Sequence, residues 1–400
     1  MADSFAAASA AVHSTAGDVR RQGGWLPDNQ DDLEAWLAGH RERVAAKGEQ
    51  VPLHPVLAEF QALIDSDPVV RMYLSEMIAQ VPRNRQYRKR HLESVPQLLQ
   101  LINEVLTMAP EYSEDAMVVL PLGAILDWTM GTPAGFAAFR DRRINAMLKK
   151  ILGVWCEFLS SSDSRYVLND SPSGWKGRAA RRAIGIEQYQ YDPGDEYWGF
   201  TSWNDFFTRC LCESTPYGLA VDVQRQDQFW LKSQPYSLQD MLANDESADR
   251  FVGGTVYQAF LSATNYHRWH SPVAGTIVRA FVQDGTYYSE PDSEGTDAAE
   301  PRYSQSYLAH VAARAVILIE ADNPVIGLTA FVPVGMNEVS SCMIDPKIQP
   351  GYHVTKGEEL GYFQFGGSTH CLVFRPGAIA GFYDPNPPLI RVRSKLATTF

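Results

Sequence analysis

The chain has 400 residues, of which 45% are hydrophobic and 20% charged, so it is long enough for two or three domains with sizeable cores. Its formal net charge of -12 argues against binding to nucleic acid and against docking on anionic lipid through bulk charge. Its five cysteines are few, scattered and odd in number, which is typical of a reducing, cytoplasmic compartment and predicts no disulfide framework.

Residues 1–30 are predicted to be disordered. Alanine and serine dominate residues 1–17, which have neither the apolar core nor the early basic residues of a secretory signal. The longest apolar run, at 117–126, is interrupted by Pro121 and is far shorter than the roughly 20 residues that span a bilayer. We therefore expect no stable membrane insertion.

Residues 31–165 are predicted to form a helical N-terminal domain. Apolar residues recur at helical spacing over 56–64 and 98–106, and a longer helix is predicted over 135–159. We interpret these apolar stripes as core rather than as binding surfaces. A polar connector rich in glycine and aromatic residues, at 166–200, then marks the domain boundary.

Residues 201–395 are predicted to form a second domain, in which strand patterns begin at about 250. Short β-branched segments at 273–278, 315–320 and 326–332 are bounded by turns and predict strands. The segment 353–363 resembles a lipoyl-type hairpin, although it lacks the lysine motif of acyl carriers. The fold class that follows is α+β, an antiparallel sheet with helices on one side.

A serine that follows two glycines, in the run FGGSTH at 365–370, is the first candidate for chemistry. Serine is a poor nucleophile unless a base removes its proton. With a base present and a strained peptide bond before it, Ser368 Oγ can attack the carbonyl of Gly367. Glycines at 366 and 367 would help, because they allow unusual backbone angles and close approach.

Two histidines about a hundred residues upstream, in the run YHRWHSP at 266–272, are the candidate bases. Histidine can take and return a proton near neutral pH. His267 and His270 are three residues apart, so a regular strand would point them to opposite faces. Both can serve one site only if a turn or bulge intervenes.

Together, the two motifs resemble those of the phosphatidylserine decarboxylase family. The segments 202–209, 235–238 and 335–339 support the resemblance. In that family a Gly-Ser bond cuts itself, and the serine becomes a pyruvoyl group that serves as electron sink without a metal or pyridoxal phosphate. The resemblance implies self-cleavage between Gly367 and Ser368, and a mature complex of the two cleaved chains that is compatible with a homo-oligomer.

The same resemblance implies roles for individual residues. The histidine that matches His270 activates the serine with help from a carboxylate, and the one that matches His267 acts in decarboxylation. Substrate contacts are implied for residues near the serine and on a second segment: Gly335, Met336, Phe365 and Gly366.

The assisting carboxylate falls where this chain departs from the family pattern. The family places it well after a Phe-Phe-x-Arg segment, whereas here Arg209 runs almost directly into CLCES at 210–214. Glu213 is the best match, and Asp222 and Asp205 are alternatives. A solvated loop carboxylate is an equally weighted interpretation of Glu213. The missing stretch is either a true deletion, which would distort the strand that carries Glu213 and impair self-cleavage, or an error in the gene model.

The N-terminal half narrows the resemblance to one branch of the family. Residues 64–70 and 158–165 resemble the helical extension of the soluble fungal L-tryptophan decarboxylase branch of psilocybin biosynthesis. This implies a pyruvoyl-dependent decarboxylase of a small aromatic L-amino acid, with tryptophan converted to tryptamine. Two alternatives remain: a phosphatidylserine decarboxylase that makes phosphatidylethanolamine, and an inactive homologue that does not process itself.

Overall fold

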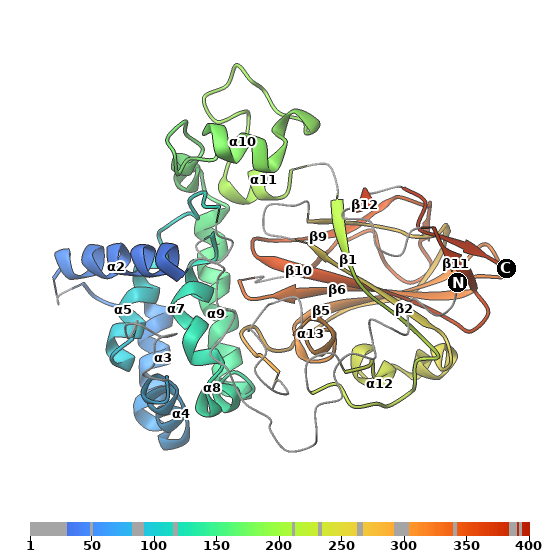
Figure 1. Cartoon of the computed structure of the whole chain (residues 1–400), viewed down its shortest axis with the longest axis horizontal. Coiled ribbons are helices and arrows are strands. Elements are labelled where there is room, and N and C mark those ends of the chain that lie inside the picture. Colours follow the sequence, from blue (N-terminus) through green and yellow to red (C-terminus); the bar gives the residue numbers. More distant parts are fainter. Residues whose placement is uncertain are drawn as a thin grey trace.

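The structure, a computed structural model, describes residues 30–48, 51–81, 92–114, 119–209, 213–230, 234–261, 267–291, 304–338, 342–383, 390–391 and 394–400. Helices of the N-terminal half lie beside an antiparallel sheet of the C-terminal half, and one hydrophobic core runs through both (Figure 1). The predicted mixture of helices and antiparallel sheet is therefore confirmed. None of the helices in these ranges is long and apolar enough to cross a membrane.

The described N-terminal helices are α2 (Gln30–Ala46), α3 (Pro55–Ser66), α4 (Pro68–Ala79), α5 (Val95–Val105), α7 (Pro121–Met130), α8 (Pro133–Ala138) and α9 (Arg142–Leu159). The single helix predicted over 135–159 is wrong, because α8 ends at Ala138 and α9 begins at Arg142. Asp141 causes the break: its side chain accepts hydrogen bonds from the backbone N–H groups of Arg143 and Ile144 and so caps a new helix.

The segment predicted as a connector, 166–200, packs into the main core. It contains α10 (Arg178–Ile184) and the 3₁₀ turn η2 (Ile186–Gln188), and it follows directly from η1 (Ser162–Val167). Trp175 is 1% exposed, and its Nε1 donates a hydrogen bond to the carbonyl oxygen of Pro110 at 2.8 Å. The segment therefore contributes to folding rather than only joining two bodies.

The C-terminal part is built on an eight-stranded sheet in the order β12-β1-β2-β10-β6-β5-β4-β8, with antiparallel pairing throughout. Its strands are β1 (Glu213–Val221), β2 (Thr255–Leu261), β4 (Gly275–Gln283), β5 (Arg314–Ala321), β6 (Leu328–Met336), β8 (His353–Val354), β10 (Gly367–Phe374) and β12 (Ile390–Arg391). The strands predicted at 273–278, 315–320 and 326–332 correspond to β4, β5 and β6.

A second sheet has the order β3-β9-β7, and a further pair joins β11 to β13. Their strands are β3 (Arg268–His270), β7 (Cys342–Ile344), β9 (Glu359–Phe363), β11 (Ile379–Phe382) and β13 (Ala397–Thr399). The expected hairpin at 353–363 has its two strands, but they do not pair with each other. β8 pairs with β4 of the large sheet and β9 pairs with β3 and β7, so the turn between them carries the chain from one sheet to the other.

The two faces of the large sheet have different surroundings. One face packs on the helices, including α13 (Gln305–Val311), and Cys371 and Val373 of β10 belong to that core. The other face packs on the small sheet, and Leu372 and Phe374 belong to that second core. Because side chains alternate along a strand, Thr369 faces the helices, whereas Ser368 faces the small sheet.

Candidate active site

Ser368 lies near the start of β10, in the interior of the large sheet. It is opposite Leu261 of β2 and Gly335 of β6, and Gly367 is opposite Met336. The Ser368 side chain is fully buried, and its Oγ has no hydrogen-bond partner among the described residues. A buried hydroxyl without a partner costs about 1–3 kcal/mol, which is unusual for a residue that serves packing alone.

The two glycines before Ser368 differ in what the backbone requires. Gly366 has a φ of 139°, an angle that residues with a side chain rarely adopt, so the turn needs glycine there. Gly367 has no positive φ, and a Cβ added to it would lie 3.9 Å from Met336 Cβ, an ordinary contact. The backbone freedom expected of both glycines is thus used at Gly366 only.

An aromatic cluster from the helical part holds Phe365, the residue before this turn. The Phe365 ring centroid lies 5.4 Å from that of Trp155 in α9 and 5.8 Å and 5.1 Å from those of Trp203 and Phe207 in α11 (Trp203–Phe207). All four side chains are buried. The helical part thereby fixes the position of the turn that leads into Ser368.

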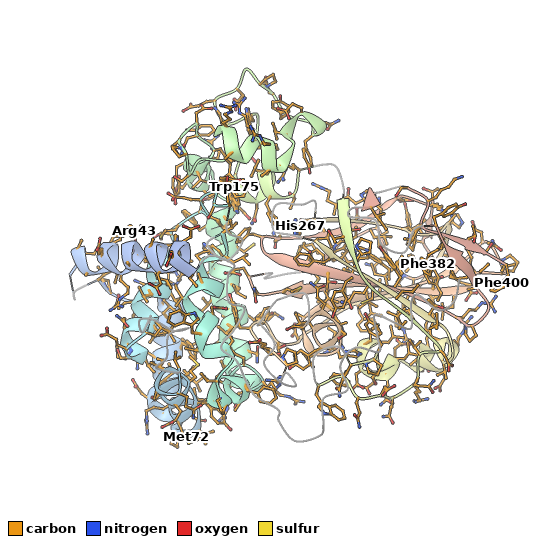
Figure 2. The ribbon with its side chains drawn as sticks, in the orientation of Figure 1. Arg43, Met72, Trp175, His267, Phe382 and Phe400 are labelled. Atoms are coloured by element: carbon orange, nitrogen blue, oxygen red, sulfur yellow. The ribbon has the colours of Figure 1, made fainter. Side chains whose placement is uncertain are left out.

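The two candidate histidines lie at β3 in different surroundings. His267, directly before the strand, is fully buried and stacks on Phe207 with ring centroids 4.1 Å apart. Figure 2 shows it where the sheet meets the helices. His270, the last residue of β3, is half-buried, and its Nδ1 lies 3.0 Å from the carbonyl oxygen of Gly357. A carbonyl only accepts, so Nδ1 donates and Nε2 is the basic nitrogen of the neutral ring.

The strand pairing around the histidines contains the irregularity that the sequence required. The register of β3 against β9 shifts between Trp269 and His270. No hydrogen bond joins Ser368 Oγ to His270. His270 lines the pocket on the Ser368 face of the large sheet, but the two side chains are not hydrogen-bonded.

Strand register separates the candidate carboxylates, although the Glu213 side chain and residues 210–212 lie outside the described part of the chain. Thr215 pairs with Phe260, next to Leu261, so Glu213 begins β1 at the end of the sheet where Ser368 lies. Asp222 follows the other end of β1, roughly 20 Å away along the strand. Asp205 accepts hydrogen bonds from Thr201 N and Oγ1, a local helix-capping role. The register therefore favours Glu213 over both alternatives.

A pocket of about 680 Å³ lies on the Ser368 face of the large sheet. It reaches the neighbourhood of Ser368, because Leu261 and His370, the nearest same-face residues on β2 and β10, both line it. Tyr257 Oη and Trp269 Nε1 in its wall have no hydrogen-bond partner among the described residues. A largely apolar wall that includes several aromatic rings and a few polar groups is typical of a small-molecule site.

The predicted site residues do not all line this pocket. His270 lines it. The four residues predicted to contact substrate, Gly335, Met336, Phe365 and Gly366, surround the Gly367–Ser368 bond instead. Neither they nor His267 line the pocket, and the fully buried Ser368 lies behind its wall rather than in it. Apart from His270, the predicted residues named here therefore lie around Gly367 and Ser368 or before β3 rather than in the wall of the pocket.

His370 is one of the pocket residues that the sequence did not reveal, and it is the one that shares a strand face with Ser368. It lies two residues after Ser368 on the same face of β10 and is half-buried, with its ring centroid 5.7 Å from that of Phe331. Burial lowers the pKa of His370 to about 4 and keeps the ring neutral. The period of two in a strand could have revealed it, because positions 368 and 370 share a face in any regular register.

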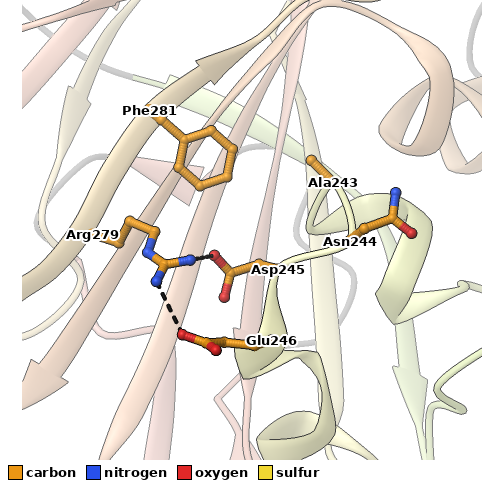
Figure 3. Close-up of a pocket in the computed structure, with 6 residues that line it drawn as sticks. All are labelled: Ala243, Asn244, Asp245, Glu246, Arg279 and Phe281. Carbon is orange, nitrogen blue, oxygen red and sulfur yellow. Dashed lines mark hydrogen bonds and ion pairs between the residues drawn. The ribbon is translucent and has the colours of Figure 1, made fainter.

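A second hollow, of about 600 Å³, is shallow and lies over β4, three strands from β10 (Figure 3). Its charged groups already pair with one another: Arg279 donates to Asp245 at 2.5 Å and to Glu246 at 3.1 Å. None of the six residues that line it is a serine, threonine, cysteine or histidine. The cavity beside Ser368 is therefore the better candidate for chemistry.

Comparison with known proteins supplies family matches. Two domain models of phosphatidylserine decarboxylase match residues 54–184 and 216–393. The L-tryptophan decarboxylase of Psilocybe cubensis is 34% identical over 404 residues, which cover 89% of this chain and 88% of that protein. Decarboxylase iboD of Amanita muscaria is 40% identical over 302 residues, or 66% and 86% of the two chains. A phosphatidylserine decarboxylase proenzyme of Bacillus mycoides is 32% identical over 230 residues, or 53% and 82%.

Proposed function

Because the chain belongs to the phosphatidylserine decarboxylase family and is a carboxy-lyase, we propose that it converts L-tryptophan to tryptamine with a pyruvoyl group made from its own Ser368. The observation that carries the proposal is the buried, unpartnered Oγ of Ser368 beside an aromatic-lined pocket. Identities of 34% and 33% to two Psilocybe L-tryptophan decarboxylases, each over 89% of the chain, support an aromatic amino acid as substrate.

The surroundings of Ser368 fit a pyruvoyl group at this position. Its Oγ makes no hydrogen bond among the described residues that conversion would break, and Gly335 opposite it has no side chain. A cut before Ser368 would leave the new end held between β2 and β6, while β12 of the same fragment pairs with β1. In that place the group would supply an electron sink for the carbanion formed when carbon dioxide leaves.

The residues of the chain carry the self-cleavage. His270 removes the proton of Ser368 Oγ, which adds to the Gly367 carbonyl carbon; the C–N bond breaks, its nitrogen takes a proton, and an ester replaces the amide. Loss of the Ser368 α-proton then expels Gly367 as a carboxylate and leaves a dehydroalanine. Water replaces its nitrogen, which departs as ammonia, so one water is consumed and one ammonia released.

A denaturing gel with intact mass measurement tests the cleavage. Wild-type protein should give two chains, the smaller spanning residues 368–400 and blocked to Edman sequencing. Ser368→Ala should remain one chain, and His270→Ala should cut at least about 100-fold more slowly because it lacks the base. His267→Ala should still cut but lose turnover. A wild-type chain that stays at full mass would overturn the proposal.

Product analysis tests the substrate separately from the cleavage. Cleaved enzyme should release tryptamine from L-tryptophan, and Ser368→Ala should release none. Vesicles that contain phosphatidylserine serve as the comparison substrate, since the family also contains phosphatidylserine decarboxylases. Phosphatidylethanolamine without tryptamine would keep the pyruvoyl chemistry and reject the amino acid substrate.

A further inference from the structure

We propose that His370 accepts a hydrogen bond from the ring N–H of the indole side chain and so selects tryptophan over aromatic amino acids without that donor. The inference rests on the proposed function and adds the residue that sets its specificity. It starts from a placement: Ser368 and His370 are successive same-face residues of β10, and His370 and Leu261, the neighbours of Ser368 on that face, line the pocket.

The spacing along β10 suits recognition of a side chain rather than of the reacting carbon. Decarboxylation at a group derived from Ser368 requires the α-carbon of the substrate beside position 368. His370 is two residues further along a strand, about 7 Å away. A substrate laid along β10 would therefore present the far part of its side chain, not its α-carbon, to the imidazole.

The surroundings of His370 make its ring a selective acceptor. Three aromatic rings follow one another beside His370. Measured between ring centroids, Phe331 lies 5.7 Å from His370, and Trp269 lies 6.4 Å from Phe331. Phe363 lies 4.8 Å from Trp269. These three rings also line the pocket and give it faces on which an indole can pack. Among the described residues that line the pocket there is no carboxylate, so it lacks the strongest competing acceptor for an N–H group.

The state of His370 is compatible with this role. Its ring makes no hydrogen bond within the described part of the chain, so its acceptor is not already used. Burial lowers its pKa to about 4, which leaves one ring nitrogen with a lone pair at neutral pH. An imidazole left unpaired by the wrong substrate costs about 1–3 kcal/mol, or roughly 5- to 150-fold in kcat/KM.

The test compares L-tryptophan, 1-methyl-L-tryptophan and L-phenylalanine on cleaved enzyme. We expect wild-type kcat/KM for tryptophan to exceed that for each of the other two at least about 5-fold. In His370→Leu, which removes both ring nitrogens, the advantage of tryptophan over phenylalanine should fall to within about threefold. His370→Gln, whose amide oxygen still accepts, should keep part of the preference. A denaturing gel confirms in each variant that self-cleavage has occurred.

His353→Leu is the matched control. His353 is an exposed histidine on β8, 3.0 Å from Asp322, and its loss should leave the substrate preference unchanged. Equal wild-type rates on tryptophan and 1-methyltryptophan, or an unchanged preference in His370→Leu, would overturn the role of His370 while the cleavage and decarboxylation still stand. Absence of decarboxylation of all three amino acids by a cleaved enzyme would overturn the proposed function, and this role with it.

Discussion

Ser368 and Thr369 are adjacent residues of β10, and both are fully buried and carry a hydroxyl group. The hydroxyl of Thr369 is hydrogen-bonded, whereas that of Ser368 is not. On the helix face, Thr369 Oγ1 donates to the Ala259 carbonyl oxygen at 2.9 Å and accepts from Gln258 Nε2 at 3.1 Å. Gln258 in turn accepts from the Tyr236 hydroxyl at 2.7 Å. On the pocket face, Ser368 Oγ has no partner among the described residues.

The difference shows how a buried hydroxyl without a partner can be kept in a defined place. The hydrogen bonds of Thr369 and the pairing of β10 with both β2 and β6 fix the strand from the helix side. The hydroxyl on the other side can then stay unpaired without letting the strand move. An unfavourable local environment of this kind persists only where the surrounding structure holds it, and it is concentrated at functional sites.

Removing each hydroxyl in turn should change the free energy of unfolding in opposite directions. The measurement belongs in the His270→Ala background, where the chain is expected to stay uncut. There, Thr369→Val should lower the free energy of unfolding by about 1–3 kcal/mol, because it leaves Ala259 O without this donor and Gln258 Nε2 with one partner fewer. Ser368→Ala should raise it by about 1 kcal/mol, because it removes a buried hydroxyl that has no partner.

Urea denaturation of the three uncut proteins gives both differences, and a denaturing gel checks that each chain is intact. The same sign for both substitutions would contradict the comparison. In particular, a clear loss of stability in Ser368→Ala would mean that Oγ has a partner in solution.

The sequence could predict the parts of this site that depend on local rules. The β-branched runs predicted β4, β5 and β6, and the glycine motif indicated the turn at Gly366, although Ser368 itself lies in β10. The start of a new helix at α9 could also have been predicted from the sequence, because aspartate, here Asp141, is a preferred helix N-cap residue.

What depended on contacts between distant segments could not be predicted. The pocket needs the register of β2, β6 and β10 together with the small sheet packed over them, and no local pattern specifies that packing. The aromatic cluster around Phe365 includes Trp155, which lies some two hundred positions earlier in the chain. The hairpin expected at 353–363 could not be corrected from the sequence for the same reason. Its two strands, β8 and β9, pair with strands from elsewhere in the chain rather than with each other.

The turn before β10 decides which hydroxyl faces the pocket, since a slip of one residue would exchange Ser368 and Thr369 between the two faces. In the uncut His270→Ala background, Gly366→Ala should lower the free energy of unfolding by about 1–2 kcal/mol, because alanine disfavours a φ of 139°. Gly367→Ala is its matched control and should be neutral or slightly stabilising, by up to about 0.5 kcal/mol, because its Cβ finds an ordinary contact. Equal losses in urea denaturation would show that Gly367 also needs glycine.

Acid should lower the free energy of unfolding through His370 on the pocket face. Burial lowers its pKa from 6.5 to about 4, so the unfolded chain takes up the proton first as the pH falls. The stability contributed by the neutral ring is therefore complete above pH 6.5 and is lost as the pH falls towards 4.

Between pH 7 and 4.5, His370→Gln in the uncut background should lose about 1 kcal/mol less stability than its parent. The difference is modest because the half-buried ring lines the pocket. Urea denaturation across this range measures the difference, with His353→Gln as the exposed-histidine control; parallel curves for His370→Gln and its parent would mean that the ring is as well solvated in the folded chain as in the unfolded one.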